Sequence, residues 1–195
     1  MTEAIKISLI TGGTSGIGSV IADVLSDRGD QVITVSSRNL NDENHISVDL
    51  SSEEKISQIS RRIGKKRINN LIFCHRYRGD KWRKEFQISL ISVHHIIENL
   101  SNNLTSNASI VIIGSNASRF ILDEQTLAYH ATQSALESLT RYYAVHLGAQ
   151  SVRCNCVLVG GTIIKPENAD FFTKNNPVRK LIEEIRPLRK IGDAR

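Results

Sequence analysis

The apolar positions of this 195-residue chain follow two different spacings that alternate along the sequence. Short apolar runs predict buried strands at residues 5–10, 31–36, 45–49, 70–74, 109–114 and 152–159. Apolar residues at helical spacing predict helices from residue 20 toward Gly29, and over residues 52–63, 84–104 and 127–147. Alternating strands and helices predict an α/β fold, a Rossmann-like doubly wound parallel sheet of about six strands with helices on both faces.

The loop after the first predicted strand is rich in glycine and reads Thr11-Gly-Gly-Thr-Ser-Gly-Ile-Gly18. Gly12, Gly16 and Gly18 have no Cβ, so the backbone can turn tightly there and approach a pyrophosphate closely. Unpaired N–H groups at the start of the following helix would stabilise the charge of that ligand. The order of strand, turn and helix therefore predicts a nucleotide phosphate site, and the alternative is an ordinary turn between two elements.

Length and composition fit a single domain over residues 1–195. A hydrophobic content of 40% is enough for one core, and the sequence has neither a linker-like stretch nor an internal repeat. It has no apolar run of membrane-spanning length and no basic leader, so we expect a cytoplasmic protein without a membrane partner. The cysteines and histidines lack the spacing of a metal site, so no metal is expected.

Several further motifs follow the glycine loop in a fixed order, and with it the chain resembles the short-chain dehydrogenase/reductase family over almost its whole length. The motifs are Val48-Asp49-Leu50, Ile113-Gly114-Ser115, Tyr129-His-Ala-Thr-Gln133, Arg153-Cys-Asn155 and Gly160. The resemblance implies that Asp49 accepts a hydrogen bond from adenine with Leu50 beside it, whereas local sequence alone also allows Asp49 to cap a helix. The implied cofactor contacts are Gly12, Thr14, Ser15, Gly16, Ile17, Gly18, Ser37, Arg38, Asp49, Leu50, Gln133, Gly160 and Thr162.

The residues after the second predicted strand bear on the choice of cofactor. An acidic side chain at that place would bind both ribose hydroxyls and repel a 2′-phosphate. This chain has Ser36-Ser37-Arg38 there, and the Arg38 guanidinium offers a fork of donors that suits a phosphate. Ser15 and Ser37 could add hydroxyl donors. NADP(H) is therefore favoured over NAD(H), and the alternative is that Arg38 is a solvated surface arginine.

The residues at the catalytic positions depart from the family pattern. The resemblance makes Tyr129 the proton donor or acceptor of the alcohol/carbonyl pair, but Gln133 stands where the family has a lysine. Tyr129 and Gln133 share one helix face, yet a neutral amide supplies no charge to stabilise a phenolate whose ordinary pKa is about 10. Ser115 matches the serine that orients the carbonyl, with Asn116 as the competing match, and Ser89 replaces an asparagine that supports a water.

Basic residues surround the fourth predicted strand and raise the net charge to +5. The segment 76–84 combines cations with two aromatic residues, which allows a nucleic-acid patch, a border of the cofactor cleft that holds an anionic substrate, or a solvated loop. We expect no nucleic-acid partner. The segment 166–190 resembles the variable substrate-covering region, and the chain reaches Arg195 without the family's last helix and strand. The sixth strand is then expected to be an exposed edge, in a naturally short or an incomplete chain.

Two functions agree with these features. The first is an NADP(H)-dependent oxidoreductase that reduces a carbonyl or oxidises an alcohol, with Tyr129 as proton donor, Ser115 as carbonyl orienter, and a small-molecule substrate that is neutral or anionic. The second is a catalytically impaired pseudoenzyme that binds the nucleotide as a sensor or as the partner subunit of an active homologue. The long helices 84–104 and 127–147 could form the helical interface of a homo-oligomer or hetero-oligomer.

Overall fold

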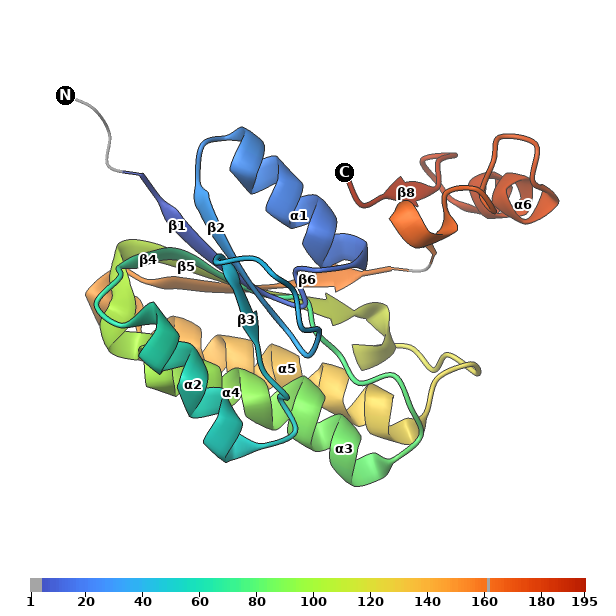
Figure 1. The fold of residues 1–195 in the computed structure, drawn as a ribbon. Coiled ribbons are helices and arrows are strands. Elements are labelled where there is room, and N and C mark those ends of the chain that lie inside the picture. The colour runs from blue at the N-terminus through green and yellow to red at the C-terminus, as the bar shows by residue number, and fades with distance from the viewer. Residues whose placement is uncertain (1–4, 161) are drawn as a thin grey trace.

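A computed structural model describes residues 5–160 and 162–195, and its centre is one parallel six-stranded sheet (Figure 1). The strand order is β3-β2-β1-β4-β5-β6. The chain therefore moves outward from β1 to β3, then crosses over to the other side of β1 and continues to β6. This confirms the predicted Rossmann-like topology. The strands are β1 (Ile7–Thr11), β2 (Gln31–Ser36), β3 (His45–Ser47), β4 (Ile68–Phe73), β5 (Leu104–Ser115) and β6 (Arg153–Val159).

The strand bounds agree with the hydrophobic pattern except at β5. β2 has the predicted bounds, and β1, β3, β4 and β6 shift by one or two residues at their ends. β5 begins at Leu104 rather than at residue 109, and Leu104 pairs with Ile68. Asn107 has a φ of 68°, and the register between β4 and β5 shifts nearby. The prediction was wrong here because the polar residues 105–107 contain no apolar alternation.

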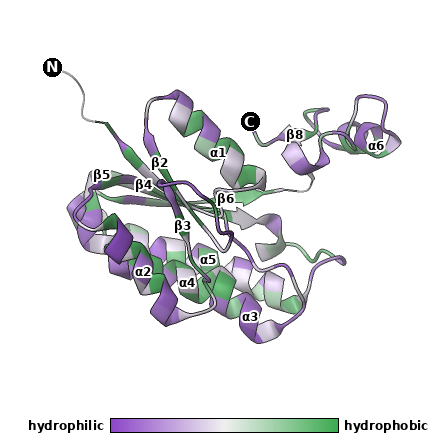
Figure 2. Ribbon diagram, viewed as in Figure 1, coloured by the Kyte–Doolittle hydropathy of each residue, from purple (hydrophilic) through white to green (hydrophobic). Residues whose placement is uncertain are grey.

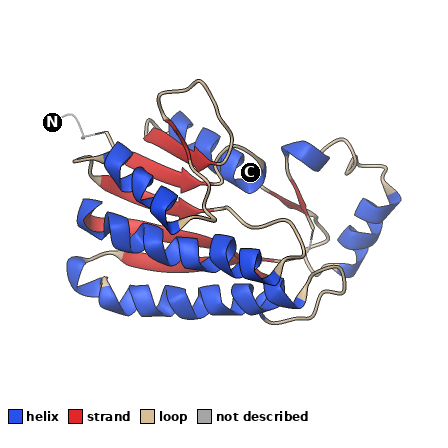
Figure 3. Ribbon diagram, turned by 60° about the horizontal axis from the view of Figure 1, so that its bottom comes forward, coloured by secondary structure: helices blue, strands red, loops and turns tan. Residues whose placement is uncertain are grey.

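Helices cover both faces of the sheet (Figures 1 and 3). Helix α1 (Gly16–Asp27) lies on one face, and α2 (Glu53–Ile63), α4 (Ser92–Leu100) and α5 (Leu127–His146) lie on the other. Ile56, Ile59 and Ile63 of α2 are buried at helical spacing, and they belong to the same core as the inward residues of β4 and β5. In Figure 2 these helices carry both hydrophobic and hydrophilic residues, as amphipathic helices do. The part of the chain that the structure describes contains no helix long and apolar enough to cross a membrane.

The helix predicted over residues 84–104 has different bounds and an interruption. It begins with α3 (Trp82–Phe86), passes through a π-helical turn at Gln87–Ile91, and continues as α4 to Leu100. A π turn inserts one extra residue and changes which side chains face inward. Here it buries the side chain of Ser89. The short 3-10 helices are Ser101–Asn103, Asn116–Ser118, Gly148–Gln150 and Pro166–Asn168.

The segment after β6 contains structure that the apolar pattern does not predict. The short strands β7 (Ile163–Ile164) and β8 (Gly192–Asp193) pair in parallel, and α6 (Pro177–Ile185) lies between them. The side chain of Asn176 accepts hydrogen bonds from Val178 N–H and Arg179 N–H, and Pro177 follows as the first helical residue. Within the described residues β6 pairs only with β5, so the predicted edge strand is confirmed.

The side chain of His75 connects the end of β1 to the helix that contains the π turn. Its Nδ1 lies 2.6 Å from Thr11 Oγ1, and its Nε2 lies 2.9 Å from the Ile88 carbonyl oxygen and 2.8 Å from Ser92 Oγ. Because a carbonyl oxygen only accepts, Nε2 is assigned the proton, and Nδ1 accepts from Thr11. Burial of the ring lowers the pKa of His75 to about 4.

The lowered pKa of His75 predicts a loss of stability in acid. The unfolded chain has a histidine pKa of about 6.5, so between pH 6.5 and 4 it binds the proton more readily than the folded chain. The contribution is complete above pH 6.5 and decreases as the pH falls toward 4. We expect a decrease of roughly 1 to 2 kcal/mol in the free energy of unfolding, after a reduction for the partial exposure of the ring.

Urea unfolding at pH 7.0, 5.5 and 4.5 measures this contribution. His75→Gln should be less stable than the unmodified protein at pH 7.0 and should lose less stability on acidification. His146→Gln is the matched control, because His146 is exposed at the end of α5, where its Nδ1 lies 2.8 Å from the Tyr142 carbonyl oxygen. Equal pH slopes for the unmodified protein and His75→Gln would contradict the prediction.

Candidate functional site

A cavity of about 520 Å³ opens at the carboxyl ends of the central strands. Parallel strands direct these ends toward the same edge of the sheet, where ligands of such folds bind. The volume lies within the range of small-molecule sites. Most of the predicted site residues line this cavity: Gly12, Thr14, Ser15, Gly16, Ile17, Ser37, Arg38, Asp49, Leu50, Ser115, Tyr129 and Gln133.

The glycine loop forms one wall of the cavity. Gly12 and Gly16 have φ values of 72° and 59°, in the left-handed region that favours glycine. Ser15 has extended backbone angles, and its hydroxyl accepts no hydrogen bond from the first turn of α1 within the described residues. The N–H groups of that turn therefore need an acceptor from elsewhere in the chain or from a ligand. Gly16 N–H donates to the Glu167 carboxylate at 2.5 Å.

Gly18 has a packing role and does not line the cavity. A Cβ at this position would lie 2.2 Å from the Gly12 carbonyl oxygen and 2.8 Å from the Gly12 carbonyl carbon. Side chains cannot approach backbone atoms this closely, so only glycine allows the first turn of α1 to meet the loop. Gly18 thus sets the position of the helix start rather than a contact with a ligand.

The polar side chains after β2 and β3 lie at one end of the cavity. Arg38 is exposed, and its Nη1 donates to the Thr14 carbonyl oxygen at 3.1 Å, which holds the guanidinium over the glycine loop. Asp49 accepts hydrogen bonds from Ser51 Oγ at 2.7 Å and Ser51 N–H at 3.0 Å, and these two contacts lower the pKa of Asp49. The cap of α2 is Ser52, so the alternative of Asp49 as the helix cap is wrong.

Ser115, Tyr129 and Gln133 meet at the cavity from the end of β5 and the first turns of α5. Ser115 lines the cavity and Asn116 does not, which favours Ser115 in the choice between these two neighbours. Gln133 is 3% exposed, and its Oε1 has no hydrogen-bond partner among residues 5–160 and 162–195. A buried acceptor without a partner is costly, so this oxygen is suited to a ligand donor.

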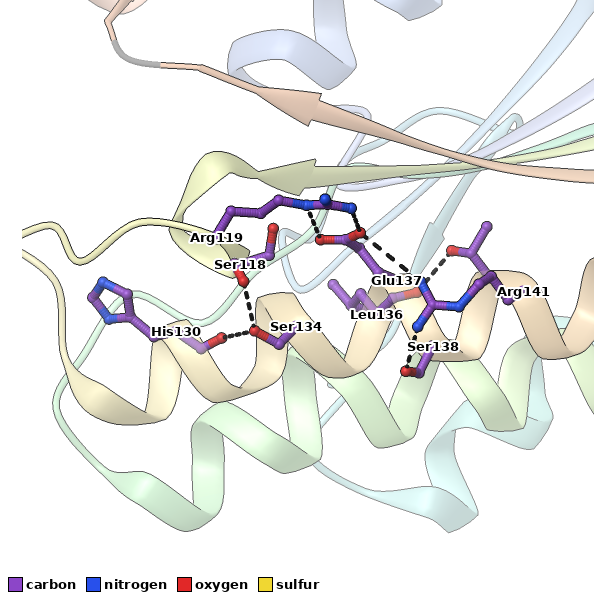
Figure 4. Close-up of polar contacts among 9 residues, drawn as sticks. Ser118, Arg119, His130, Ser134, Leu136, Glu137, Ser138 and Arg141 are labelled. Carbon is purple, nitrogen blue, oxygen red and sulfur yellow. Dashed lines mark hydrogen bonds and ion pairs between the residues drawn. The ribbon is translucent and has the colours of Figure 1, made fainter.

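The loop after Ser115 is attached to α5 by polar contacts (Figure 4). Arg119 makes a two-point contact with Glu137, with Nη2 at 2.5 Å and Nε at 3.3 Å from the carboxylate oxygens. Hydrogen bonding to Arg119 is the largest cause of the lowered pKa of Glu137. Ser134 Oγ donates to the Ser118 carbonyl oxygen at 3.0 Å. These contacts fix the turn that carries Ser115 against the helix that carries Tyr129.

Three further predicted residues lie outside the cavity lining. Ser89 is buried, and its Oγ accepts a hydrogen bond from Tyr77 N–H at 2.9 Å, so it supports the backbone after β4. The carbonyl oxygens of Gly160 and Thr162 accept hydrogen bonds from Arg186 Nη2 at 3.4 and 2.8 Å. Residue 161 between them lies outside the described residues.

Several cationic side chains face the same cavity, and the sequence identified only some of them. Arg76 Cζ lies 5.4 Å from the centroid of the Tyr129 ring, within the range of a cation–π contact. Arg78 and Lys165 also line the cavity. The segment 76–84 was among the expected borders of the cleft, and Glu167 falls in the expected substrate-covering segment 166–190, whereas Lys165 had no local signal. The contact of Glu167 with Gly16 joins residues 151 positions apart in the sequence.

The described residues contain no cluster of three histidine, cysteine or acidic side chains that could hold a metal ion. The cysteines are free thiols, of which Cys154 is buried. Burial raises the pKa of the Cys74 thiol, which stands next to the glycine loop, to about 12. A thiol with so high a pKa is a packing group and not a nucleophile at neutral pH.

The chain is similar to curated oxidoreductases and to solved structures of the same fold. It is 28% identical to the rhamnolipids biosynthesis 3-oxoacyl-[acyl-carrier-protein] reductase of Pseudomonas aeruginosa, over 80% of this chain and 72% of that protein. It is 24% identical to dehydrogenase/reductase SDR family member 4 of Rattus norvegicus, over 96% and 76%. The ligand-free aldohexose dehydrogenase of Thermoplasma acidophilum superimposes with a TM-score of 0.82 at 22% identity, over 97% and 82% of the two chains.

A family model gives the assignment that covers most of the chain. The model described as enoyl-(acyl carrier protein) reductase matches residues 12–195, which include the glycine loop from Gly12 onward and every residue of the cavity wall. A short-chain dehydrogenase family protein from Francisella tularensis has a TM-score of 0.80 and covers 98% of this chain and 87% of its own. The chain belongs to the short-chain dehydrogenase/reductase family of NAD(P)-dependent oxidoreductases.

Proposed function

We propose that this protein binds NADP(H) in the cavity and interconverts a carbonyl and an alcohol by hydride transfer. The observation that carries the proposal is the meeting of the glycine loop, Ser115 and Tyr129 around a single cavity. The loop supplies a cradle for phosphates, and the two hydroxyl side chains lie where a substrate oxygen can be bound. Direct measurement of NADPH binding by calorimetry tests the first step of the proposal.

The residues of the cavity fit a dinucleotide. Backbone N–H groups at the start of α1 suit the pyrophosphate, and the apolar side chains of Val48 and Leu50 suit an aromatic base next to Asp49. Gln133 Oε1 could accept a hydrogen bond from a ribose hydroxyl, which would satisfy an acceptor that has no protein partner in the described part of the chain. When bound, the nicotinamide supplies or accepts the hydride.

Tyr129 is the proposed proton donor to the substrate oxygen, with Ser115 as the hydrogen-bond donor that orients the carbonyl. Gln133 lies one helical turn after Tyr129 and carries no charge, so it leaves the phenol without the cation that the resemblance implies at this position. We therefore expect Gln133 to make turnover by this protein slow. This substitution is also the observation that favours the second candidate function, a pseudoenzyme that binds the nucleotide as a sensor or partner subunit.

The cationic side chains that line the cavity favour an anionic substrate. Arg76 lies over the Tyr129 ring, and Arg78 and Lys165 face the same space. A carboxylate or phosphate on the substrate could pair with these groups while its carbonyl faces Tyr129. A protein partner is also part of the proposal, since α5 presents exposed apolar residues such as Tyr142 and Val145 that a second copy or a homologue could cover.

Removal of the Arg38 guanidinium should weaken binding of NADPH and leave NADH binding nearly unchanged. A charge-assisted contact with a 2′-phosphate contributes about 1.5 to 3 kcal/mol, so Arg38→Ala should raise the Kd for NADPH roughly 10- to 100-fold. The measurement is fluorescence titration with both nucleotides. Arg61→Ala is the control, because Arg61 is exposed on α2 and does not line the cavity. The same loss of affinity for both nucleotides would oppose the assigned preference.

A lysine at position 133 should raise the rate of carbonyl reduction. Gln133→Lys places a cation beside the phenol, and general acid catalysis contributes roughly a hundred- to ten-thousandfold, so a gain of at least tenfold in kcat is expected. NADPH oxidation is followed at 340 nm across a panel of neutral and anionic carbonyl compounds, with Tyr129→Phe as the inactive control. Turnover in the unmodified protein that disappears in Tyr129→Phe would exclude the pseudoenzyme. No turnover in either the unmodified or the lysine protein would oppose the oxidoreductase.

A further inference from the structure

The carboxylate of Glu167 lies at the N-terminus of α1. Glu167 belongs to the 3-10 helix Pro166–Asn168, which follows β7 and lies beside the first turn of α1 (Figure 1). Its Oε1 accepts a hydrogen bond from Gly16 N–H at 2.5 Å. The same N–H belongs to the glycine loop that lines the cavity. A side chain of the chain itself thus takes a donor that the proposed function gives to the cofactor pyrophosphate.

The surroundings of this carboxylate favour an anion. Its pKa is held below the ordinary range by its own backbone N–H, then by Gly16 N–H, and then by the charges of Lys165 and Arg78. A Cβ on Gly16 would lie 3.7 Å from Glu167 Oε1 and 3.9 Å from the Lys165 side chain. An anion at the start of α1 therefore has backbone donors and cations on several sides.

We propose that Glu167 is an internal competitor of the cofactor pyrophosphate and sets the affinity for the nucleotide. The inference rests on the proposed function, because it concerns the same phosphate cradle. An incoming pyrophosphate takes the Gly16 N–H, and the Glu167 carboxylate leaves it. Lys165 and Arg78, whose charges act on Glu167 in the free protein, would then act on the phosphate, so the exchange replaces one anion with another.

The exchange connects nucleotide binding to the segment after β6. Asn168 holds this segment in its present shape, since its Oδ1 accepts from Lys165 N–H at 2.8 Å and its Nδ2 donates to the Ile163 carbonyl oxygen at 3.1 Å. Ile163 and Lys165 line the cavity from the same segment. Glu167 is therefore held beside the cavity by a segment that itself forms part of the cavity lining.

The affinity of variants for NADPH and for inorganic pyrophosphate tests this inference. Glu167→Gln keeps the size of the side chain and removes its charge, so the Kd for both probes should fall roughly 5- to 30-fold. Lys165→Met removes a cation from the cradle and should raise both values. Glu183→Gln is the matched control, because Glu183 pairs with Arg179 on α6 at 2.9 Å and does not line the cavity.

The amide resonance of Gly16 in a ¹⁵N-labelled protein reports the contact itself. Its chemical shift should change in ligand-free Glu167→Gln, stay unchanged in Glu183→Gln, and change again when pyrophosphate is added. Equal Kd values for NADPH in the unmodified protein and in Glu167→Gln would show that Glu167 does not compete with the nucleotide, while nucleotide binding itself would remain supported. Binding seen only in Glu167→Gln would support it strongly, and absence of binding in both proteins would overturn the competitor and the proposed function together.

Discussion

The close approach of α1 to the glycine loop is the contact on which the whole site depends. A Cβ added at Gly18 would lie 2.2 Å from the Gly12 carbonyl oxygen, and a Cβ added at Gly12 would lie 2.6 Å from the backbone nitrogen of His75. Both neighbours are backbone atoms, so neither can yield by turning a side chain. These close approaches place the start of α1 at the point where the strand order reverses between β1 and β4. The helix N–H groups face the cavity for this reason.

The sequence predicted those parts of the fold in which local pattern and tertiary environment agree. β2 alternates and α2 repeats apolar residues at helical spacing, so β2 has the predicted bounds and the start of α2 differs only by its cap, Ser52. The early part of β5 is held by pairing with β4 and not by its own apolar residues, so its sequence resembles a loop. The π turn at Gln87–Ile91 has no periodic signature either, because its extra residue breaks the helical repeat.

Residues next to strand ends were predictable as site residues because a parallel sheet forces those ends together. Ser37, Arg38 and Ser115 follow β2 or end β5, and each lines the cavity. The segment 166–190 was expected to cover the substrate, but the contact of Glu167 with the glycine loop was not predictable, because it joins residues 151 positions apart and depends on how β6 is followed by β7. Ser89 was expected to support a water at the site, but it does not line the cavity, and its hydroxyl, on the π turn, accepts a hydrogen bond from Tyr77 N–H.

In the proposed function, nucleotide binding and proton transfer depend on different parts of the molecule. The phosphate cradle is made of backbone groups and of cations such as Arg38 and Lys165, and its geometry comes from the β1–α1 turn. Tyr129, the proposed proton donor, lies on α5, and the contact of Arg119 with Glu137 attaches the loop after Ser115 to the same helix (Figure 4). A neutral residue at position 133 therefore lowers the charge beside Tyr129 without disturbing the cradle. Under the proposal, the chain could bind the nucleotide even if Gln133 slows proton transfer, so both candidate functions agree with the same structure.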